Sequence, residues 1–258
     1  MYSGTFAAME EQLIWILMVV VGFVAGFINT IAGGASILTL PAMILIGLDP
    51  TVANGTNRLG IAISAFSASA GYQSKKINTF PFSIYLGLSA TIGSVIGAMI
   101  AVDFEKGMFN RVLAVIMIII ILLMIFKPKM DVTDIAEKLS GKRLWISIAA
   151  FFVFGIYGGF INAGMGLIMM IWLNYFNKLD LIRTNATKVL VAGIYTVAAI
   201  VVFLVNDLID WKIGLLLVFG NMVGGWISAR LSVKKGEGLV KAGMIVMVII
   251  MAIKLWFF

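Results

Sequence analysis

The sequence contains no cysteine and no histidine. Without cysteine the chain has no disulfide, no thiolate metal site and no thiol nucleophile. Without histidine it lacks the commonest metal ligand and the usual general base of enzymes. These absences exclude most enzyme chemistry, so we expect a protein that is not an enzyme and that needs no metal and no cofactor.

Charged residues are scarce as well, at 12% of the 258 residues, whereas 62% are hydrophobic and the mean hydropathy is +1.09. A soluble core of this size cannot hide so much apolar surface. Hydrophobic runs of about 20 residues, the length that crosses a bilayer, recur along the chain. The fold class is therefore an all-α, polytopic transmembrane helical bundle. The runs cover residues 12–31, 51–72, 80–101, 108–126, 144–163, 184–205, 212–230 and 238–258.

The amino-terminal segment and the net charge fit the same class. Residues 1–11 contain two acids and no Lys or Arg, unlike a secretory signal peptide, so we expect the first apolar run to be retained. The net charge is +7, but the basic residues fall in short loops between the runs. Orientation in a membrane explains such loops better than binding to nucleic acid.

The chain is an internal duplication. The segment GFVAGFIN at 22–29 returns as GIYGGFIN at 155–162, and a glycine cluster follows each copy. The segment NGTNR at 54–58 matches NATKV at 185–189, at nearly the same offset along the chain. We expect a first membrane repeat at 1–126, a cytoplasmic linker at 127–143 and a second membrane repeat at 144–258.

Eight simple spans would divide the basic loops between both sides of the membrane, against the positive-inside rule. The rule is satisfied if 12–48 and 144–177 each hold a full helix, a break at the glycines and a short element near 35–47 or 167–177. These short elements are broken or re-entrant and add to the eight long spans. Each repeat then crosses the membrane an odd number of times, which makes the two repeats inverted. The N-terminus is then extracytoplasmic. The cytoplasmic side collects Lys75, Lys76, Lys127, Lys129, Lys138, Lys142, Arg143, Lys178, Arg183, Arg230, Lys234 and Lys235.

Glycines inside the apolar runs have two interpretations. Gly22-x-x-x-Gly26 and Gly93-x-x-x-Gly97 are typical of close helix packing. The clusters Gly33-Gly34 and Gly164-x-Gly166 differ, because each lies at mid-membrane depth beside an asparagine, where unwound backbone must be buried or line a cavity. A helix that starts at such a break offers N–H groups to an anion. Asparagine at this depth, Asn29 or Asn162, serves either as a ligand or as a hydrogen bond between helices.

A second polar group lies near the start of an apolar helix in each repeat. It comprises Asn54, Thr56, Asn57 and Arg58 in the first and Asn185, Thr187 and Lys188 in the second. One interpretation is a capped helix end whose cation snorkels to the interface. The other is an anion site, because a cation one to two turns inside a span usually faces a cavity or a partner. No acid is predicted at mid-depth, which disfavours a buried carboxylate proton relay.

The segments GFINTIAGGAS at 26–36, ANGTNR at 53–58, GFINAGMG at 159–166 and TNATK at 184–188 resemble the TauE/SafE family of sulfite and organosulfonate exporters. The resemblance covers nearly the whole chain. It implies a bacterial or archaeal inner-membrane permease that exports an anion such as sulfite, sulfoacetate or another C2 sulfonate. The cations are offset by one position between the repeats. The substrate-binding residues that the resemblance implies are Asn29, Gly33, Gly34, Asn54, Thr56, Asn57, Arg58, Asn162, Gly164, Gly166, Asn185, Thr187 and Lys188.

The expected function is therefore transport of a small sulfur-containing anion by alternating access, with the anion near the midplane between the two broken segments. The alternatives are a passive anion channel and a non-transporting membrane scaffold or assembly factor. Coupling to protons or to sodium stays open. The expected partners are the anion, membrane lipid and, through the small-residue faces, a second copy in a homodimer.

Overall fold

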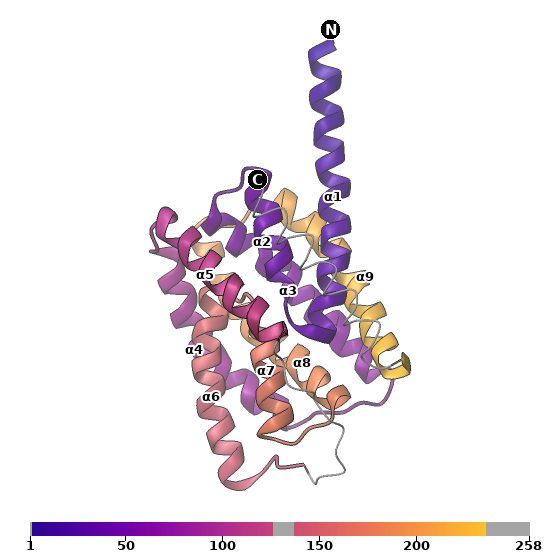
Figure 1. Cartoon of the computed structure of the whole chain (residues 1–258), viewed down its shortest axis with the longest axis vertical. Helices are drawn as coiled ribbons and strands as arrows, with labels where there is room; N and C mark the ends of the chain where they lie inside the picture. The colour runs from indigo at the N-terminus through magenta and orange to yellow at the C-terminus, as the bar shows by residue number, and fades with distance from the viewer. Residues whose placement is uncertain (1, 126–136, 236–258) are drawn as a thin grey trace.

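The computed structural model describes residues 2–125 and 137–235. This part of the chain folds into helices joined by short connections (Figure 1). The predicted span at 238–258 and most of the predicted linker lie outside the described residues. In chain order the helices are α1 (Tyr2–Ala32), α2 (Ser36–Leu45), α3 (Pro50–Gln73), α4 (Phe82–Val102), α5 (Lys106–Ile125), α6 (Gly141–Phe160), α7 (Met165–Tyr175), α8 (Leu181–Val205) and α9 (Trp211–Lys235).

Five of the described helices are long and apolar enough to cross a membrane: α1 from Glu11 onward, α4, α6, α8 and α9. The predicted span 51–72 is the helix α3, which is 24 residues long but less apolar, because it carries the polar group around Arg58. The short elements α2 and α7 have 10 and 11 residues and lie where short elements were predicted. The all-helical membrane class is thus established, and the count of eight long spans stays a prediction.

The glycine clusters lie at the two helix breaks, as predicted. Gly33 follows α1 with a φ of +75°, and Gly164 precedes α7 with a φ of +68°. Glycine adopts this left-handed conformation without a steric penalty and therefore commonly ends a helix. Asn162 also has a positive φ, of +57°, so the second break is sharply bent at two residues.

The long helices pack mainly across the two halves of the chain. The helix α1 lies along α9, and α6 lies along α4 in the corresponding way, while α3 contacts both α8 and α9. A methyl group on Gly26 would come within 2.5 Å of the Asn221 carbonyl oxygen, and one on Gly93 within 2.8 Å of the Ile156 nitrogen. The packing interpretation of the GxxxG pairs is confirmed, because side chains larger than hydrogen would push these backbones apart.

The two breaks meet in the middle of the molecule. In Figure 1, α1 descends from the upper end to mid-height and α2 turns back upward, whereas α6 rises from the lower end and α7 turns back downward. Gly33 contacts the backbone of Gly166 at the meeting point. This contact brings the two glycine clusters together.

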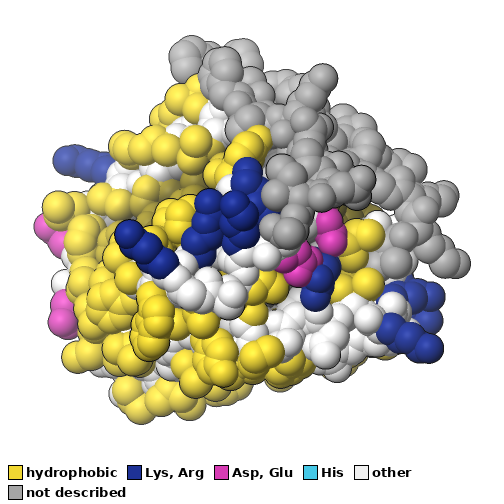
Figure 2. Space-filling model, turned by 90° about the horizontal axis from the view of Figure 1, so that it is seen from below, with side chains coloured by type: hydrophobic (Ala, Val, Ile, Leu, Met, Phe, Trp, Pro, Cys, Tyr) yellow, Lys and Arg dark blue, Asp and Glu magenta, His cyan; other side chains and the backbone are white. Residues whose placement is uncertain are grey.

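The outer surface of the bundle suits lipid. Large apolar side chains such as Ile92, Val201, Leu215 and Phe219 are exposed on it. The lower end in Figure 1 holds the start of α6 and the connections from α3 to α4 and from α7 to α8. Figure 2 views the molecule from this end and shows Lys and Arg side chains gathered within a largely apolar outline.

Candidate functional site

The helices α3 and α8 begin at equivalent caps. The Asp49 carboxylate accepts a hydrogen bond from the N–H of Thr51 at 3.0 Å, and the Asp180 carboxylate accepts one from the N–H of Arg183 at 2.8 Å. A carboxylate at this position satisfies an N–H group that has no partner within the helix, and it suits the positive end of the helix dipole. Both helices are therefore capped, as one interpretation of the sequence predicted.

The cations that follow these caps do not snorkel. Arg58 lies about 12 Å and Lys188 about 10 Å beyond the first residue of its helix, at roughly 1.5 Å per residue. The Arg58 side chain is fully buried, and Lys188 is 2% exposed. Burial of both cations removes the snorkelling interpretation and leaves two charges that need partners inside the protein.

Arg58 binds the end of α6, which belongs to the other half of the chain. Its guanidinium donates hydrogen bonds to the carbonyl of Gly158, to the carbonyl of Gly159 at 2.8 Å and to Asn54 Oδ1 at 3.1 Å. The guanidinium carbon lies 5.5 Å from the centre of the Phe203 ring. None of these partners is an anion, and the Nε of Arg58 is buried without a hydrogen-bond partner among the described residues.

Lys188 binds the end of α1 in the reciprocal way. Its Nζ donates to the carbonyl of Thr30 and to Asn185 Oδ1, both at 2.8 Å, and lies 3.4 Å from the sulfur of Met170. The last carbonyls of a helix have no intrahelical donor and form the negative end of its dipole. Each cation thus satisfies carbonyls at the break of the opposite half, which explains why both are tolerated at this depth.

The polar neighbours of Arg58 on α3 hold the breaks in place. Asn54 donates from Nδ2 to the carbonyl of Phe160 at 2.7 Å. Asn57 donates to Ser36 Oγ at 3.0 Å and accepts from Thr39 Oγ1 at 2.7 Å, so it ties α3 to the first turns of α2. Of this set, Asn54 and Asn57 therefore join Arg58 at the breaks.

Other predicted site residues take no part in the hydrogen bonds of this group. Thr56 accepts a hydrogen bond from the N–H of Asp210 at 2.9 Å and so holds the start of α9. Asn29 lies on α1 and is partly exposed, and Gly34 is buried in the first break. Within residues 2–125 and 137–235, the buried Thr187 hydroxyl has no hydrogen-bond partner, which is costly in a packed interior.

Two tyrosines that the sequence analysis missed complete the second break. The Tyr195 hydroxyl donates to Asn162 Oδ1 at 2.5 Å, and the Tyr157 hydroxyl donates to the carbonyl of Ala163 at 2.5 Å. Tyr157 stands inside the repeated motif at 155–162, where the first copy has Val24. This difference between the two copies is the signal that points to an unequal site.

The comparisons with known proteins cover both helix breaks and both buried cations. The family model described as sulfite exporter TauE/SafE matches residues 18–255, which include both breaks and both cations. The chain belongs to the TauE/SafE family. No solved structure gives a significant match.

Curated relatives of this TauE/SafE protein are similar along almost their full length. A probable membrane transporter protein of Haemophilus influenzae is 28% identical over 235 residues, 91% of each chain. A probable membrane transporter protein of Sinorhizobium, ORF9, is 29% identical over 237 residues, 92% of this chain and 90% of its own. YfcA of Escherichia coli, also named a probable membrane transporter protein, is 25% identical over 248 residues, 96% and 91%. The TauE/SafE protein is accordingly a multi-pass membrane transporter, and these names state no substrate.

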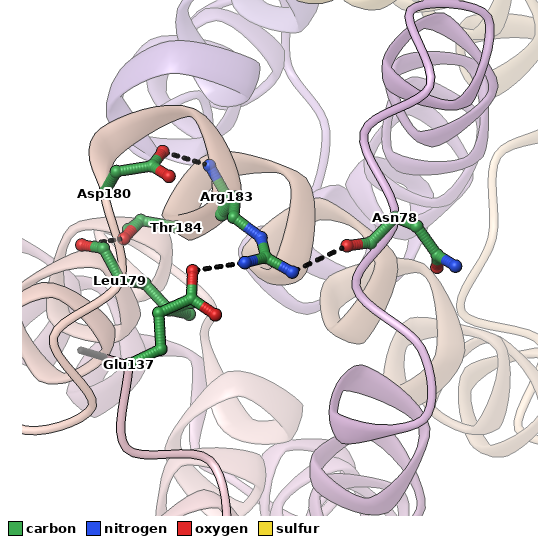
Figure 3. A network of polar contacts seen from close by, with 6 residues as sticks. All are labelled: Asn78, Glu137, Leu179, Asp180, Arg183 and Thr184. Carbon is green, nitrogen blue, oxygen red and sulfur yellow. Dashed lines mark hydrogen bonds and ion pairs between the residues drawn. The ribbon is translucent and has the colours of Figure 1, made fainter.

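The lower end of the TauE/SafE protein is held by Arg183, at the start of α8. Figure 3 shows its guanidinium between the Glu137 carboxylate, with which it forms an ion pair, and the Asn78 carbonyl, at 3.3 Å. One side chain thus joins α8, the segment before α6 and the connection between α3 and α4. Within the described residues no cluster of three acidic side chains is arranged as metal ligands.

Proposed function

We propose that the protein is a secondary transporter that moves a small sulfur-containing anion, such as sulfite or a C2 sulfonate, across the inner membrane by alternating access. The observation that carries the proposal is the guanidinium of Arg58. It is fully buried against the end of α6, and the three oxygens that accept its hydrogen bonds are neutral. A buried cation held by neutral acceptors has an unused capacity to bind an anion.

The chemistry of the site matches an oxyanion. Sulfite and sulfonates carry three oxygens on sulfur. Their transfer from water into a protein site therefore requires several hydrogen-bond donors at once. A guanidinium presents a rigid fork of N–H donors and forms charge-assisted hydrogen bonds with such groups. Asn54 accepts one of its hydrogen bonds and, like Asn162 at the second break, has a side-chain amide. The carbonyls of Gly158 and Gly159 hold the guanidinium in this structure, and an entering anion would compete with them.

The architecture supports alternating access. We infer two inverted repeats with an extracytoplasmic N-terminus, because α1 and α6 run in opposite directions in Figure 1 and each cation binds the broken helix of the opposite half. The anion would bind near the midplane at the contact between the repeats, where broken helices form the site of many secondary transporters. Rocking of one half against the other would then expose Arg58 to each side in turn. The substrate class is supported by the family description, sulfite exporter.

Tracer flux in proteoliposomes tests the proposal. We expect saturable flux of sulfite or sulfoacetate, stimulated by the same anion on the opposite side, with taurine, sulfate and chloride as competitors. Arg58→Gln removes the charge, and Arg58→Lys keeps it but removes the fork, so both should lower flux at least about 10-fold, the loss of one charge-assisted hydrogen bond. Arg111→Gln, an exposed arginine on α5, is the matched control and should transport as the wild type does.

The same experiment separates the alternatives. Saturable flux without stimulation from the opposite side would identify a passive anion channel. Absence of flux for every anion, in protein that remains folded and monodisperse, would indicate a scaffold or a different solute. Unchanged flux in both Arg58 variants would show that Arg58 has a purely structural role at the end of α6.

A further inference from the structure

The two halves of the site are chemically unequal. Tyr195 on α8 occupies the place that Ser64 has on α3 when NATKV is aligned with NGTNR, and Tyr157 on α6 replaces Val24 of α1 in the repeated motif. At these two aligned positions the second half therefore carries two phenol hydroxyls, and the first half carries one small hydroxyl. We propose that the anion is recognised at the second break, beside Arg58, and that the Tyr195 hydroxyl is a specificity-determining donor to it. This inference rests on the proposed function.

The Tyr195 hydroxyl and the Arg58 guanidinium meet at one residue. A methyl group on Gly158 would lie 3.1 Å from the Tyr195 oxygen, and the Gly158 carbonyl accepts a hydrogen bond from Arg58. Tyr195 is 1% exposed, and its ring packs in the apolar cluster with Phe151 and Met165. Packing on the ring and a bond on the hydroxyl fix the direction of its one O–H donor.

Arg58, which binds the end of α6 at the second break, also has a hydrogen-bond donor that is not used. In the described part of the chain the buried Nε of Arg58 finds no acceptor, although guanidinium N–H groups are strong donors. The Lys188 ammonium, by contrast, has two oxygens and a sulfur within 3.4 Å. A single anion therefore gains more at Arg58, where it satisfies a donor that lacks an acceptor, than at Lys188, where it must displace existing acceptors.

The Tyr195 hydroxyl distinguishes between anions by the fixed direction in which it donates. Its proton now goes to the amide oxygen of Asn162 at 2.5 Å, a neutral acceptor. An oxyanion that takes the place of this acceptor receives a charge-assisted hydrogen bond, which is shorter and stronger. An oxyanion with three directed oxygens can use Arg58 and Tyr195 together. Chloride is a sphere that gains less from donors held in fixed directions, so the hydroxyl favours the oxyanion over the halide.

The test compares two buried tyrosines whose hydroxyls bind different partners. Tyr195→Phe keeps the packed ring and removes the donor at the site. Tyr72→Phe, the matched control, removes the hydroxyl of a tyrosine that is also 1% exposed but lies near the end of α3 and forms its hydrogen bond with Ser232 Oγ at 2.9 Å. For each variant, the KM and kcat for sulfite, the inhibition constant for chloride and the sulfite-induced rise in Tm are measured.

We expect Tyr195→Phe to raise the KM for sulfite about 10-fold or more, the loss of one hydrogen bond to a charged group, with a smaller change in kcat and in chloride inhibition. Tyr72→Phe should keep the wild-type ratio of the sulfite and chloride constants, whatever its Tm. An unchanged ratio in Tyr195→Phe, or the same change in both variants, would overturn this inference alone. A wild-type protein with neither flux nor a sulfite-induced rise in Tm would overturn it together with the proposed function.

Discussion

Gly33 and Gly166 lie in backbone contact where the two breaks cross. A methyl group on Gly33 would come within 2.6 Å of the Leu167 nitrogen and would overlap the backbone of Gly166. Gly33 also has a φ of +75°, which side-chain-bearing residues avoid. The contact joins the first half of the chain to the second at the level of both breaks, so any rocking of the halves must turn about it or separate it.

Gly33→Ala should destabilise the protein more than a substitution that only strains the backbone. Gly47→Ala is the matched control, because Gly47 has a φ of +99° but no atom of the described residues within 4 Å of an added methyl group. We expect a loss of about 1–2 kcal/mol for Gly47→Ala from the left-handed conformation and about 1–3 kcal/mol more for Gly33→Ala from overpacking. Thermal unfolding in detergent measures both. Equal losses would show that the crossing tolerates a methyl group.

Gly155→Ala tests the close approach of α4 and α6. An added methyl group would come within 2.8 Å of the Ala90 Cα, whereas one on Gly107 of α5 would meet no described atom within 4 Å. Overpacking should lower stability by about 1–3 kcal/mol in Gly155→Ala. Gly107→Ala should be neutral or stabilising by up to about 1 kcal/mol, because alanine favours a helix. A Tm for Gly155→Ala at or above that of the control would contradict the packing role.

Thr187→Val separates stability from transport at a predicted site residue. No described residue forms a hydrogen bond with the buried Thr187 hydroxyl, so replacing it with a methyl group of similar size should leave Tm unchanged or raise it. If the hydroxyl contacts the anion, the KM for sulfite rises at the same time. Tm and KM measured on one preparation decide between the roles. A clear fall in Tm would mean that the hydroxyl has a structural partner in solution.

A double-mutant cycle on Arg183 and Glu137 should yield a small coupling energy. The two side chains are 40% and 26% exposed, and ion pairs of this kind are worth about 0.2–1 kcal/mol. Arg183→Gln, Glu137→Gln and the double variant are compared by thermal unfolding at low and high salt. The coupling should shrink as salt screens the charges. A coupling that salt leaves unchanged would show that packing of the long side chains, and not charge, joins the two segments.

Much of the architecture could be predicted from the sequence. Hydrophobic runs predicted the five apolar helices within a few residues, because crossing a membrane requires an uninterrupted apolar stretch. The glycine clusters predicted both breaks, since a positive φ is costly for other residues. The run at 51–72 shows the limit of this method, because the polar residues that lower the hydropathy of α3 are the ones that lie at the breaks.

The roles of individual polar residues needed the folded chain. The pattern at 54–58 placed Arg58 deep in a helix, but it left snorkelling and an internal partner equally open. It also grouped Thr56 with Arg58, although Thr56 holds the start of α9. Tyr195 lies 33 residues from Asn162 and outside every motif, so nothing local connected the two.

By itself, the sequence determined that this protein lies in lipid, where its helices run, that its motifs are duplicated and how far inside their helices Arg58 and Lys188 lie. Each of these depends on composition or on spacing along the chain. Only the tertiary structure decided that Arg58 binds the carbonyls at the end of α6 and Lys188 the carbonyl of Thr30 in α1. Those contacts join residues that are far apart in the sequence, and they depend on how closely glycine lets the helices of the two halves approach.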